Sequence, residues 1–181
     1  ATGGIGGVHL NAENTNDVSA DLYALSENSN FVICSGAKSI LDLSKTNELL
    51  ETLGITRIGY QTNYMPGFWY EETENKVDNR FDEIHEISSF LKLNENIENK
   101  KSILIFNKVP LNKALNKNDV EKWINNAAIK ADRNNISGKE LTPFLIKEIN
   151  EESKNETLNA NTSLIINNAN LAGKIAKNFY S

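Results

Sequence analysis

The fold is decided by residues 31–60, which read FVICSGAKSILDLSKTNELLETLGITRIGY. The segment opens with a short apolar run, residues 31–34, that predicts a buried strand. Leucines at helical spacing in residues 46–53 predict a helix, and Gly54 closes it because glycine is common just beyond a helix end. Residues 56–60 predict a second strand. Strand, helix and strand in this order are typical of a parallel α/β unit.

The rest of the chain continues the alternation. Polar caps and apolar periodicity predict a helix starting at Ser19, and Thr142-Pro143 predicts the N-cap and first position of another. The further expected elements are helices over 82–91, 119–134, 144–152 and 169–180, a strand over 102–106, and a brief apolar run at 164–166. We therefore predict a single α/β domain over residues 1–181.

Composition excludes several classes of protein. Hydrophobic residues are 39% and charged residues 24% of the chain, as in ordinary globular proteins. No apolar run approaches the length of a membrane span. The net charge of −5 argues against binding a nucleic-acid polymer. The one cysteine, Cys34, cannot form an internal disulfide, so we expect a reducing compartment, most simply the cytoplasm.

The chain opens with the glycine-rich sequence ATGGIGGVH, residues 1–9. Glycines let the backbone approach a ligand closely and can present N–H groups to an anion, although a tight turn is the alternative. A glycine-rich turn normally follows a strand. We therefore expect this chain to be the carboxyl-terminal part of a longer enzyme.

Two aspartates follow closely, in the sequence DVSAD at residues 17–21. One carboxylate could hold a hard cation while the other orients a substrate hydroxyl. The alternative is ordinary helix capping, by Asp17 or Ser19.

Lys38 directly follows the first predicted strand and a turn of small residues. Sites in α/β proteins lie at the carboxyl ends of strands. Partial desolvation there favours the neutral amine, which can attack a carbonyl carbon. A solvent-facing lysine is the alternative. The aromatic residues at 68–70 are interpreted as core or subunit contacts rather than as a base-stacking platform.

Taken in order, these clusters resemble the pseudouridine-5′-phosphate glycosidases, also called the indigoidine synthase A-like family. The resemblance rests on segments 1–9, DVSADL at 17–22, GAKSILD at 36–42, GYQT at 59–62, TPFL at 142–145, Asn161, and NNA at 167–169. It runs over the whole chain, with several unrelated motifs in register.

The resemblance implies cleavage of the carbon–carbon glycosidic bond of pseudouridine 5′-phosphate, reversibly, to uracil and ribose 5-phosphate. The scissile bond of a C-glycoside joins two carbons and has no heteroatom to take the electrons, so the resemblance implies a covalent lysine imine at the anomeric carbon. By resemblance, Lys38 is that nucleophile and Asp17 binds one Mn²⁺ per subunit, with Mg²⁺ as an alternative. The matching substrate-binding residues are Thr2, His9, Ser19, Ala20, Asp21 and Asn161. Asp21 is also expected to move protons during ring opening.

The resemblance further implies an α/β/α three-layer sandwich with a mixed central sheet, and a homotrimer. Two positions depart from the family pattern, since Leu10 replaces a basic residue and Lys108 replaces a proline. The family's general-acid glutamate and phosphate-binding lysine belong to an amino-terminal half that no residue of this chain matches. We expect this chain alone to be inactive without that half.

Two other functions fit the same residues. One is a non-catalytic subunit that keeps the fold and binds a sugar phosphate or supports assembly. The other is a Schiff-base lyase of the acyl or aldol type, whose reactive lysine would look much the same.

Overall fold

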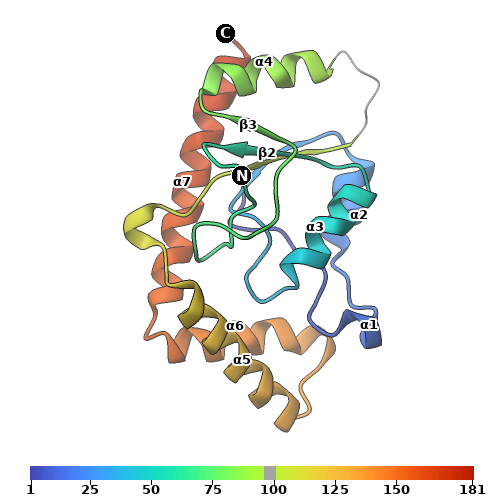
Figure 1. Ribbon diagram of the computed structural model, residues 1–181, viewed down its shortest axis with the longest axis vertical. Coiled ribbons are helices and arrows are strands. Elements are labelled where there is room, and N and C mark those ends of the chain that lie inside the picture. The colour runs from blue at the N-terminus through green and yellow to red at the C-terminus, as the bar shows by residue number, and fades with distance from the viewer. Residues whose placement is uncertain (96–100) are drawn as a thin grey trace.

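The structure, a computed structural model, describes residues 1–95 and 101–181 and is built on a four-stranded sheet. Its strands are β1 (Phe31–Cys34), β2 (Thr56–Tyr60), β3 (Asn79–Phe81) and β4 (Ile103–Phe106), arranged in the order β1-β4-β2-β3 (Figure 1). All three strand pairs are parallel. The α/β prediction is confirmed. In the described part of the chain the mixed sheet is not seen, because antiparallel pairing is limited to isolated bridges such as Val8 with Val18.

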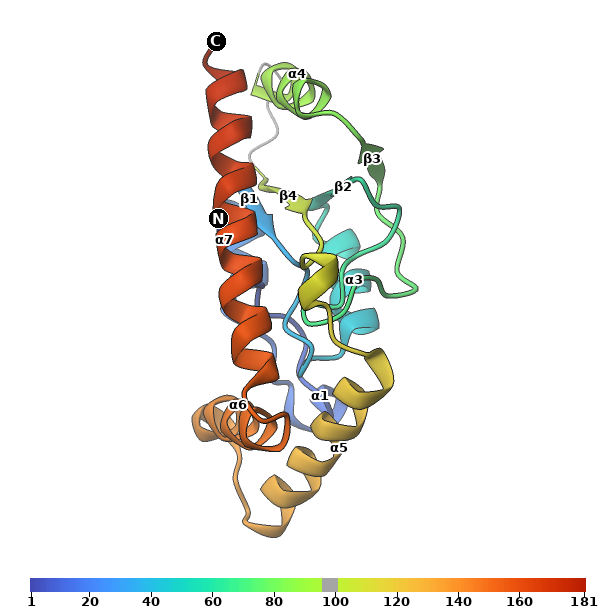
Figure 2. The ribbon, with the colours of Figure 1, turned by 90° about the vertical axis from the view of Figure 1, so that its left-hand side faces the viewer.

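Helices cover both faces of the sheet and produce three layers (Figures 1 and 2). On one face, isoleucines of β1, β2 and β4 pack against α4 (Ile84–Glu95) and α7 (Glu156–Phe179). On the other face, Cys34, Leu104 and Phe106 belong to a second core with residues of α2 (Ala20–Glu27) and α3 (Leu43–Thr52). Neighbouring residues of β4 point to opposite faces because side chains alternate along a strand. Since all four β4 residues are buried, β4 lies at the centre of the fold.

The helix limits near the site follow the expected capping chemistry. Ser19 Oγ accepts a hydrogen bond from the backbone N–H of Asp21 and caps α2, as predicted. Asp42 caps α3 in the same way, because its Oδ1 accepts a hydrogen bond from the backbone N–H of Lys45. After α3, Gly54 has a φ of 66°, the left-handed conformation that glycine adopts without strain.

Two helices extend the molecule beyond one end of the sheet, α5 (Lys117–Arg133) and α6 (Leu141–Glu152) (Figure 1). The Thr142 N-cap prediction is wrong, because α6 begins at Leu141, two residues before the predicted first position, Pro143, and its N-cap is Glu140. Pro143 is tolerated there since the first-turn N–H groups of a helix have no helical partner. The short helices are α1 (Ala12–Thr15) and the 3₁₀ turns η1 (Leu111–Lys113) and η2 (Gly138–Glu140).

The last helix, α7, is twice as long as predicted. It absorbs the apolar run at 164–166 and reaches from α6 to α4 (Figure 2). Its buried residues recur every three or four positions: Thr157, Ala160, Leu164, Asn168, Leu171, Ile175 and Phe179. This periodicity is that of a helix packed on one side. Within the described residues, no helix combines the length and apolar character needed to cross a bilayer.

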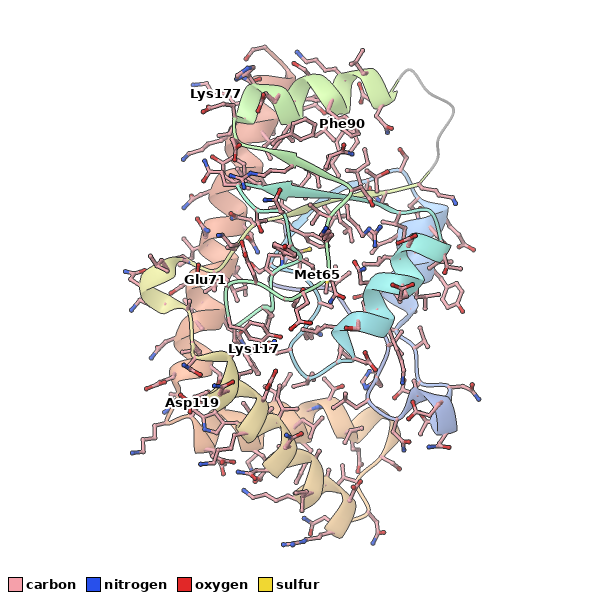
Figure 3. All side chains as sticks on the ribbon, viewed as in Figure 1. Met65, Glu71, Phe90, Lys117, Asp119 and Lys177 are labelled. Carbon is pink, nitrogen blue, oxygen red and sulfur yellow. The ribbon has the colours of Figure 1, made fainter. Side chains whose placement is uncertain are left out.

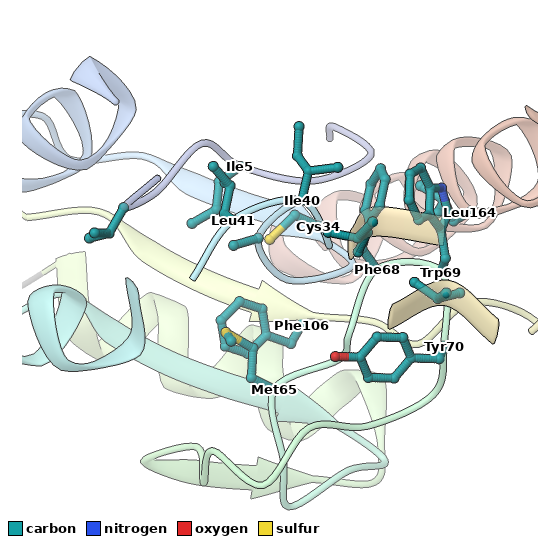
Figure 4. Close-up of a cluster of buried hydrophobic side chains, with 14 of the residues drawn as sticks. Ile5, Cys34, Ile40, Leu41, Met65, Phe68, Trp69, Tyr70, Phe106 and Leu164 are labelled. Carbon is teal, nitrogen blue, oxygen red and sulfur yellow. The ribbon is translucent and has the colours of Figure 1, made fainter. Parts of the chain in front are cut away.

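Residues 61–78 join β2 to β3 and fold over the end of the sheet that carries the site. Met65 is fully buried within this loop, whereas Glu71 lies at its edge (Figure 3). The loop then brings Phe68 and Trp69 against Leu164 of α7 (Figure 4). Strand β3 was not predicted because it is short and its residues are mostly exposed.

Candidate functional site

Lys38 follows β1 in a tightly packed turn. Its backbone N–H donates a 3.1 Å hydrogen bond to the carbonyl of Ile5, so the turn is fixed to the glycine-rich segment. Gly36 has a φ of 84°, and a Cβ there would overlap the carbonyl oxygen of Pro66. A side chain at position 36 is therefore excluded by both conformation and space. Lys38 itself is half-buried.

Lys38 lines a cavity of about 230 Å³. Its lining residues are Thr2, Gly3, Gly4, Lys38, Ile40, Phe68, Trp69, Ile146, Asn161 and Ile165. Three residues predicted from the sequence, Thr2, Lys38 and Asn161, thus come together from three distant segments. The remaining walls are mostly apolar, as in typical small-molecule sites.

The Lys38 ammonium has no side-chain partner among the described residues, whether by hydrogen bond or by ion pair. By contrast, Lys45 on α3 is paired with Glu13 at 2.8 Å. Lys38 is therefore half-buried in a mostly apolar cavity without a counter-ion among the described residues, an environment in which a lysine can act as a nucleophile.

Asn161 is held in the cavity by Trp69. The indole Nε1–H donates a 2.8 Å hydrogen bond to Asn161 Oδ1. Because Trp can only donate, this contact fixes which amide atom faces the indole. The Nδ2 group of Asn161 then has two protons to donate, and no described residue accepts them.

Phe68 and Trp69 are two of the cavity residues that sequence reasoning missed, as are Ile146 and Ile165. Both aromatic residues are buried, which agrees with their interpretation as core residues, yet both also line the cavity. Phe68 has a φ of 67°, an uncommon conformation for a bulky residue. Ser39 Oγ, next to Lys38, donates to the carbonyl of Gly67 and fastens this turn. The preceding Pro66-Gly67 signals a turn, but nothing in the sequence signals the conformation of Phe68.

The glycines of the opening segment allow close packing against neighbouring side chains, and none of them adopts an unusual backbone conformation. All of the glycines at 3, 4, 6 and 7 lack a positive φ. A Cβ at Gly4 would lie 2.7 Å from the Phe68 ring, and one at Gly6 would overlap Ser19. The segment runs beside the end of β1, where Thr2 N–H donates to Ile33. It is therefore not the tight turn that was the alternative.

The amides of this segment are partly used inside the protein. Ile5 N–H donates to Gly36, and Val8 N–H donates to the Thr46 hydroxyl at 2.9 Å. Gly6 N–H donates to Asp21 Oδ2 at 2.7 Å. These N–H groups are consequently not available to an anion.

Asp21 lies one peptide group from the backbone of Lys38. The peptide between Ile5 and Gly6 accepts from Lys38 N–H through its carbonyl and donates to Asp21 through its N–H. Asp21 is exposed, as is Ala20, while Ser19 is half-buried and bonds backbone to backbone with Gly7. The DVSAD segment therefore packs on the glycine-rich segment.

His9 and Asp17 lie in a different cavity, of about 780 Å³. It is bounded by the loop around α1 and by α5 and α6, and Thr142 also lines it. His9 Nδ1 is 3.7 Å from Asp17 Oδ2. The glycine-rich segment connects the two cavities, since Gly3 and Gly4 line the first and His9 lines the second.

The fit of a metal ion can be judged from the donors near Asp17. In residues 1–95 and 101–181, no three side chains of His, Cys, Asp or Glu are grouped closely enough to hold an ion. Asp17 supplies one carboxylate and His9 one imidazole. This donor set fits a hydrated hard cation held mainly through water molecules, and it does not fit a fully protein-coordinated ion.

Cys34 precedes the Lys38 turn but cannot act as a second nucleophile. Burial raises the pKa of its thiol to about 12. Since the thiolate is the reactive form, Cys34 is an inert core residue.

Comparison with known proteins finds relatives that match nearly the whole of this chain. Residues 1–178 match the family described as indigoidine synthase A like protein. The pseudouridine-5′-phosphate glycosidase of Petrotoga mobilis is 46% identical over 178 residues, which are 98% of this chain and 58% of that relative. The enzyme of the same name from Staphylococcus aureus is 44% identical, over 97% of this chain and 57% of its own length. The chain thus spans somewhat more than half the length of these curated relatives.

Two solved structures are also similar. The prealnumycin C-glycosynthase crystallised with ribulose 5-phosphate superposes with a TM-score of 0.92 at 31% identity, covering 98% of this chain and 59% of the other. An indigoidine synthase A-like protein from Thermotoga maritima gives a TM-score of 0.87 at 35% identity, covering 97% and 57%.

Proposed function

The chain belongs to the indigoidine synthase A-like family, and on this premise we propose that it forms the lysine-bearing part of a pseudouridine-5′-phosphate glycosidase. The reaction is reversible cleavage of the carbon–carbon glycosidic bond, giving uracil and ribose 5-phosphate. The observation that carries the proposal is the unpaired Lys38 in a cavity with Thr2 and Asn161. The ribulose 5-phosphate complex of the C-glycosynthase supports a sugar phosphate as the ligand class.

Lys38 solves the chemical problem of a C-glycoside. The Lys38 amine bonds to the anomeric carbon as the bond from that carbon to the ring oxygen breaks; the ring oxygen takes up a proton and the nitrogen gives one up. Its lone pair then forms the C=N bond while the bond to uracil breaks. The released electron pair passes to the uracil ring, which takes up a proton at the carbon that carried the sugar. Water hydrolyses the imine, returning ribose 5-phosphate and free Lys38.

The other residues bind substrate and move protons. Asp21 is proposed to exchange the proton of ring opening, because one of its carboxylate oxygens is fixed by Gly6 and the side chain is otherwise exposed. Thr2 and Asn161 are proposed to hold the substrate from the Lys38 cavity. His9, Ser19 and Ala20 are proposed to bind it from the adjoining segment.

Asp17 is proposed to hold one Mn²⁺ through water, with His9 beside it. When bound, a divalent cation would polarise nearby oxygens of the substrate. Mg²⁺ would satisfy the same oxygen donor. The homotrimer and the reducing compartment remain predictions, checked by sedimentation and by fractionation.

The test uses the full-length protein, ribose 5-phosphate and sodium borohydride. Reduction should fix the sugar on Lys38, and mass spectrometry of the peptides locates it. Lys38→Ala should abolish both labelling and uracil release, whereas Lys45→Ala, which removes a lysine already paired with Glu13, should alter neither. Absence of label on the wild-type protein, or turnover by Lys38→Ala, would falsify the proposal.

A non-catalytic binding subunit is the second candidate, and the observation that favours it is that His9 and Asp17 lie in a different cavity from Lys38. Calorimetry separates the two functions. A binding subunit would take up ribose 5-phosphate but would release no uracil from pseudouridine 5′-phosphate in the presence of Mn²⁺. A Schiff-base lyase of another type would form the borohydride adduct but yield different products.

A further inference from the structure

Asn168 is a polar side chain at the centre of the fold. It lies on α7, and its exposed fraction is 0%. Burying an amide is unfavourable unless its hydrogen bonds are made inside the protein. The contacts of Asn168 therefore indicate what it does.

The amide of Asn168 is saturated with hydrogen bonds. Its Nδ2 donates to the carbonyl of Thr2 at 2.9 Å and lies 3.3 Å from that of Gly3. The same nitrogen is 3.0 Å from Ser35 Oγ, and Oδ1 accepts from Asn107 Nδ2 at 3.0 Å. An amide has two N–H donors and one carbonyl acceptor, so little capacity remains.

These partners come from three segments that meet beneath the Lys38 cavity. Thr2 and Gly3 line the cavity, and Ser35 lies between β1 and Lys38. Asn107 directly follows β4, the strand beside β1. One side chain thus ties the glycine-rich segment to the carboxyl ends of two neighbouring strands.

The same face of α7 also carries Asn161, seven residues earlier. Residues seven apart lie on one side of a helix, two turns from each other. Leu164 lies between them, and a Cβ on Gly3 would be 3.1 Å from it. A single rigid helix therefore sets the positions of Asn161 and of the Thr2–Gly3 backbone relative to each other.

We propose that Asn168 is a positioning residue of the Lys38 cavity. It holds the Thr2 and Gly3 carbonyls and Ser35 in one arrangement, so that Thr2 faces the Lys38 amine in the geometry the reaction needs. A buried leucine would contribute to the core but would orient none of these groups. The expected effect of Asn168 on catalysis rests on the proposed function. Its effect on the position of the Thr2–Gly3 backbone does not.

The test compares Asn168→Asp with Asn167→Asp in the full-length protein. Aspartate keeps the size of asparagine but loses both N–H donors and places a charge against the carbonyls. Asn167 is the matched control, because it also donates from α7 to a backbone carbonyl, that of Lys108, which does not line the cavity. Both variants are compared with wild type at a temperature where circular dichroism and thermal melts show all three folded.

For Asn168→Asp we expect kcat to fall by about tenfold or more with KM changed less than about threefold, because positioning acts mainly in the transition state. Asn167→Asp should keep both constants within about threefold of wild type. A folded Asn168→Asp with wild-type kcat overturns the proposal, as does an equal loss in both variants. If Asn168→Asp does not fold, Ser35→Ala removes one partner, and an unchanged kcat there overturns it instead.

Hydrogen exchange separates this inference from the proposed function. The Ile5 and Gly6 amides are hydrogen-bonded within the glycine-rich segment. They should exchange about tenfold faster in Asn168→Asp, and at the wild-type rate in Asn167→Asp, even if wild type forms no adduct with ribose 5-phosphate. Unchanged exchange overturns the positioning role whatever the activity, whereas faster exchange without any wild-type adduct overturns only the proposed function.

Discussion

Trp69 donates a 2.8 Å hydrogen bond from Nε1 to Oδ1 of Asn161, across 92 positions of sequence. The contact joins the loop after β2 to α7 at the wall of the Lys38 cavity. It separates the two ends of the Asn161 amide by function. Oδ1 supports the wall, and Nδ2 has no hydrogen-bond partner among the described residues.

Substitutions of Asn161 should separate these two functions. Asn161→Asp keeps the acceptor for Trp69 but loses the Nδ2 donors, so it should retain thermal stability while ribose 5-phosphate affinity falls by about tenfold. Asn161→Ala should lose affinity and also about 1–3 kcal/mol of unfolding free energy, because the buried indole N–H is left without a partner. Calorimetric titration and urea unfolding measure the two quantities. Equal stability of the two variants would contradict the structural part of this argument.

The fluorescence of Trp69 should report ligand binding directly. The chain has two tryptophans, and Trp123 on α5 does not line the cavity. In a Trp123→Phe background, ribose 5-phosphate should shift or quench the emission, and Lys38→Ala should alter the response. A spectrum that stays constant while calorimetry detects binding would place the ligand elsewhere.

Gly6→Ala is expected to damage the site, whereas Gly173→Ala should not. A Cβ at Gly6 would overlap the Ser19 hydroxyl and lie 3.0 Å from Asp21 Oδ2, so the hydrogen bond from Gly6 N–H to Asp21 must distort. We expect a loss of about 1–3 kcal/mol in unfolding free energy and a lower kcat. At Gly173 on α7 nothing lies within 4 Å, and alanine should add about 0.5–1 kcal/mol through helix propensity. Urea titrations of both variants test the contrast.

Cys34 is expected to behave as an unreactive core thiol. Because burial raises its pKa to about 12, iodoacetamide at pH 8 should leave it unmodified in the folded protein. Labelling should begin only with global unfolding in urea, so it can serve as a probe of stability. Rapid modification under native conditions would show that the β1 end opens locally.

The elements that the sequence predicted well are those with local burial periodicity. Residues 31–34 and 56–60 are strands with the bounds expected, and Gly54 ends α3. The first half of α7 was missed because its asparagines and β-branched residues 165–166 have modest helix propensity, and packing along one face outweighs that. Strand β3 carries no apolar signal because it lies at the sheet edge.

The site was predictable in its residues but not in its geometry. Resemblance singled out Lys38, Thr2 and Asn161, which share one cavity, and their chemical roles stay predictions. The sequence did not predict that His9 and Asp17 lie in a different cavity from Lys38. Short separation in sequence does not reveal on which side of the glycine-rich segment a residue lies. Likewise, the partners of Asn168 are far away in sequence and no local pattern marks them.

Lys108, which stands where the family pattern has a proline, should stabilise the loop after β2 through Glu72. Lys108 Nζ lies 3.2 Å from Glu72 Oε1 and 4.0 Å from Glu71 Oε2. Burial alone would raise the pKa of Glu72, but hydrogen bonds from Thr62 and Lys108 and the charge of Lys108 outweigh it, and the pKa falls below its ordinary 4.5.

A carboxylate with a lowered pKa in the folded state adds stability above its unfolded pKa, and that stability disappears as the pH falls through the folded pKa. Glu72→Gln should therefore be less stable than wild type at pH 7, by under about 1 kcal/mol because the side chain is 37% exposed to screening solvent. The difference should close as the pH falls below 4.5. Glu71→Gln, at the longer distance, should change stability less at every pH. Urea unfolding from pH 7 to pH 3 measures both, and a Glu72 effect that grows toward acid would contradict the assignment.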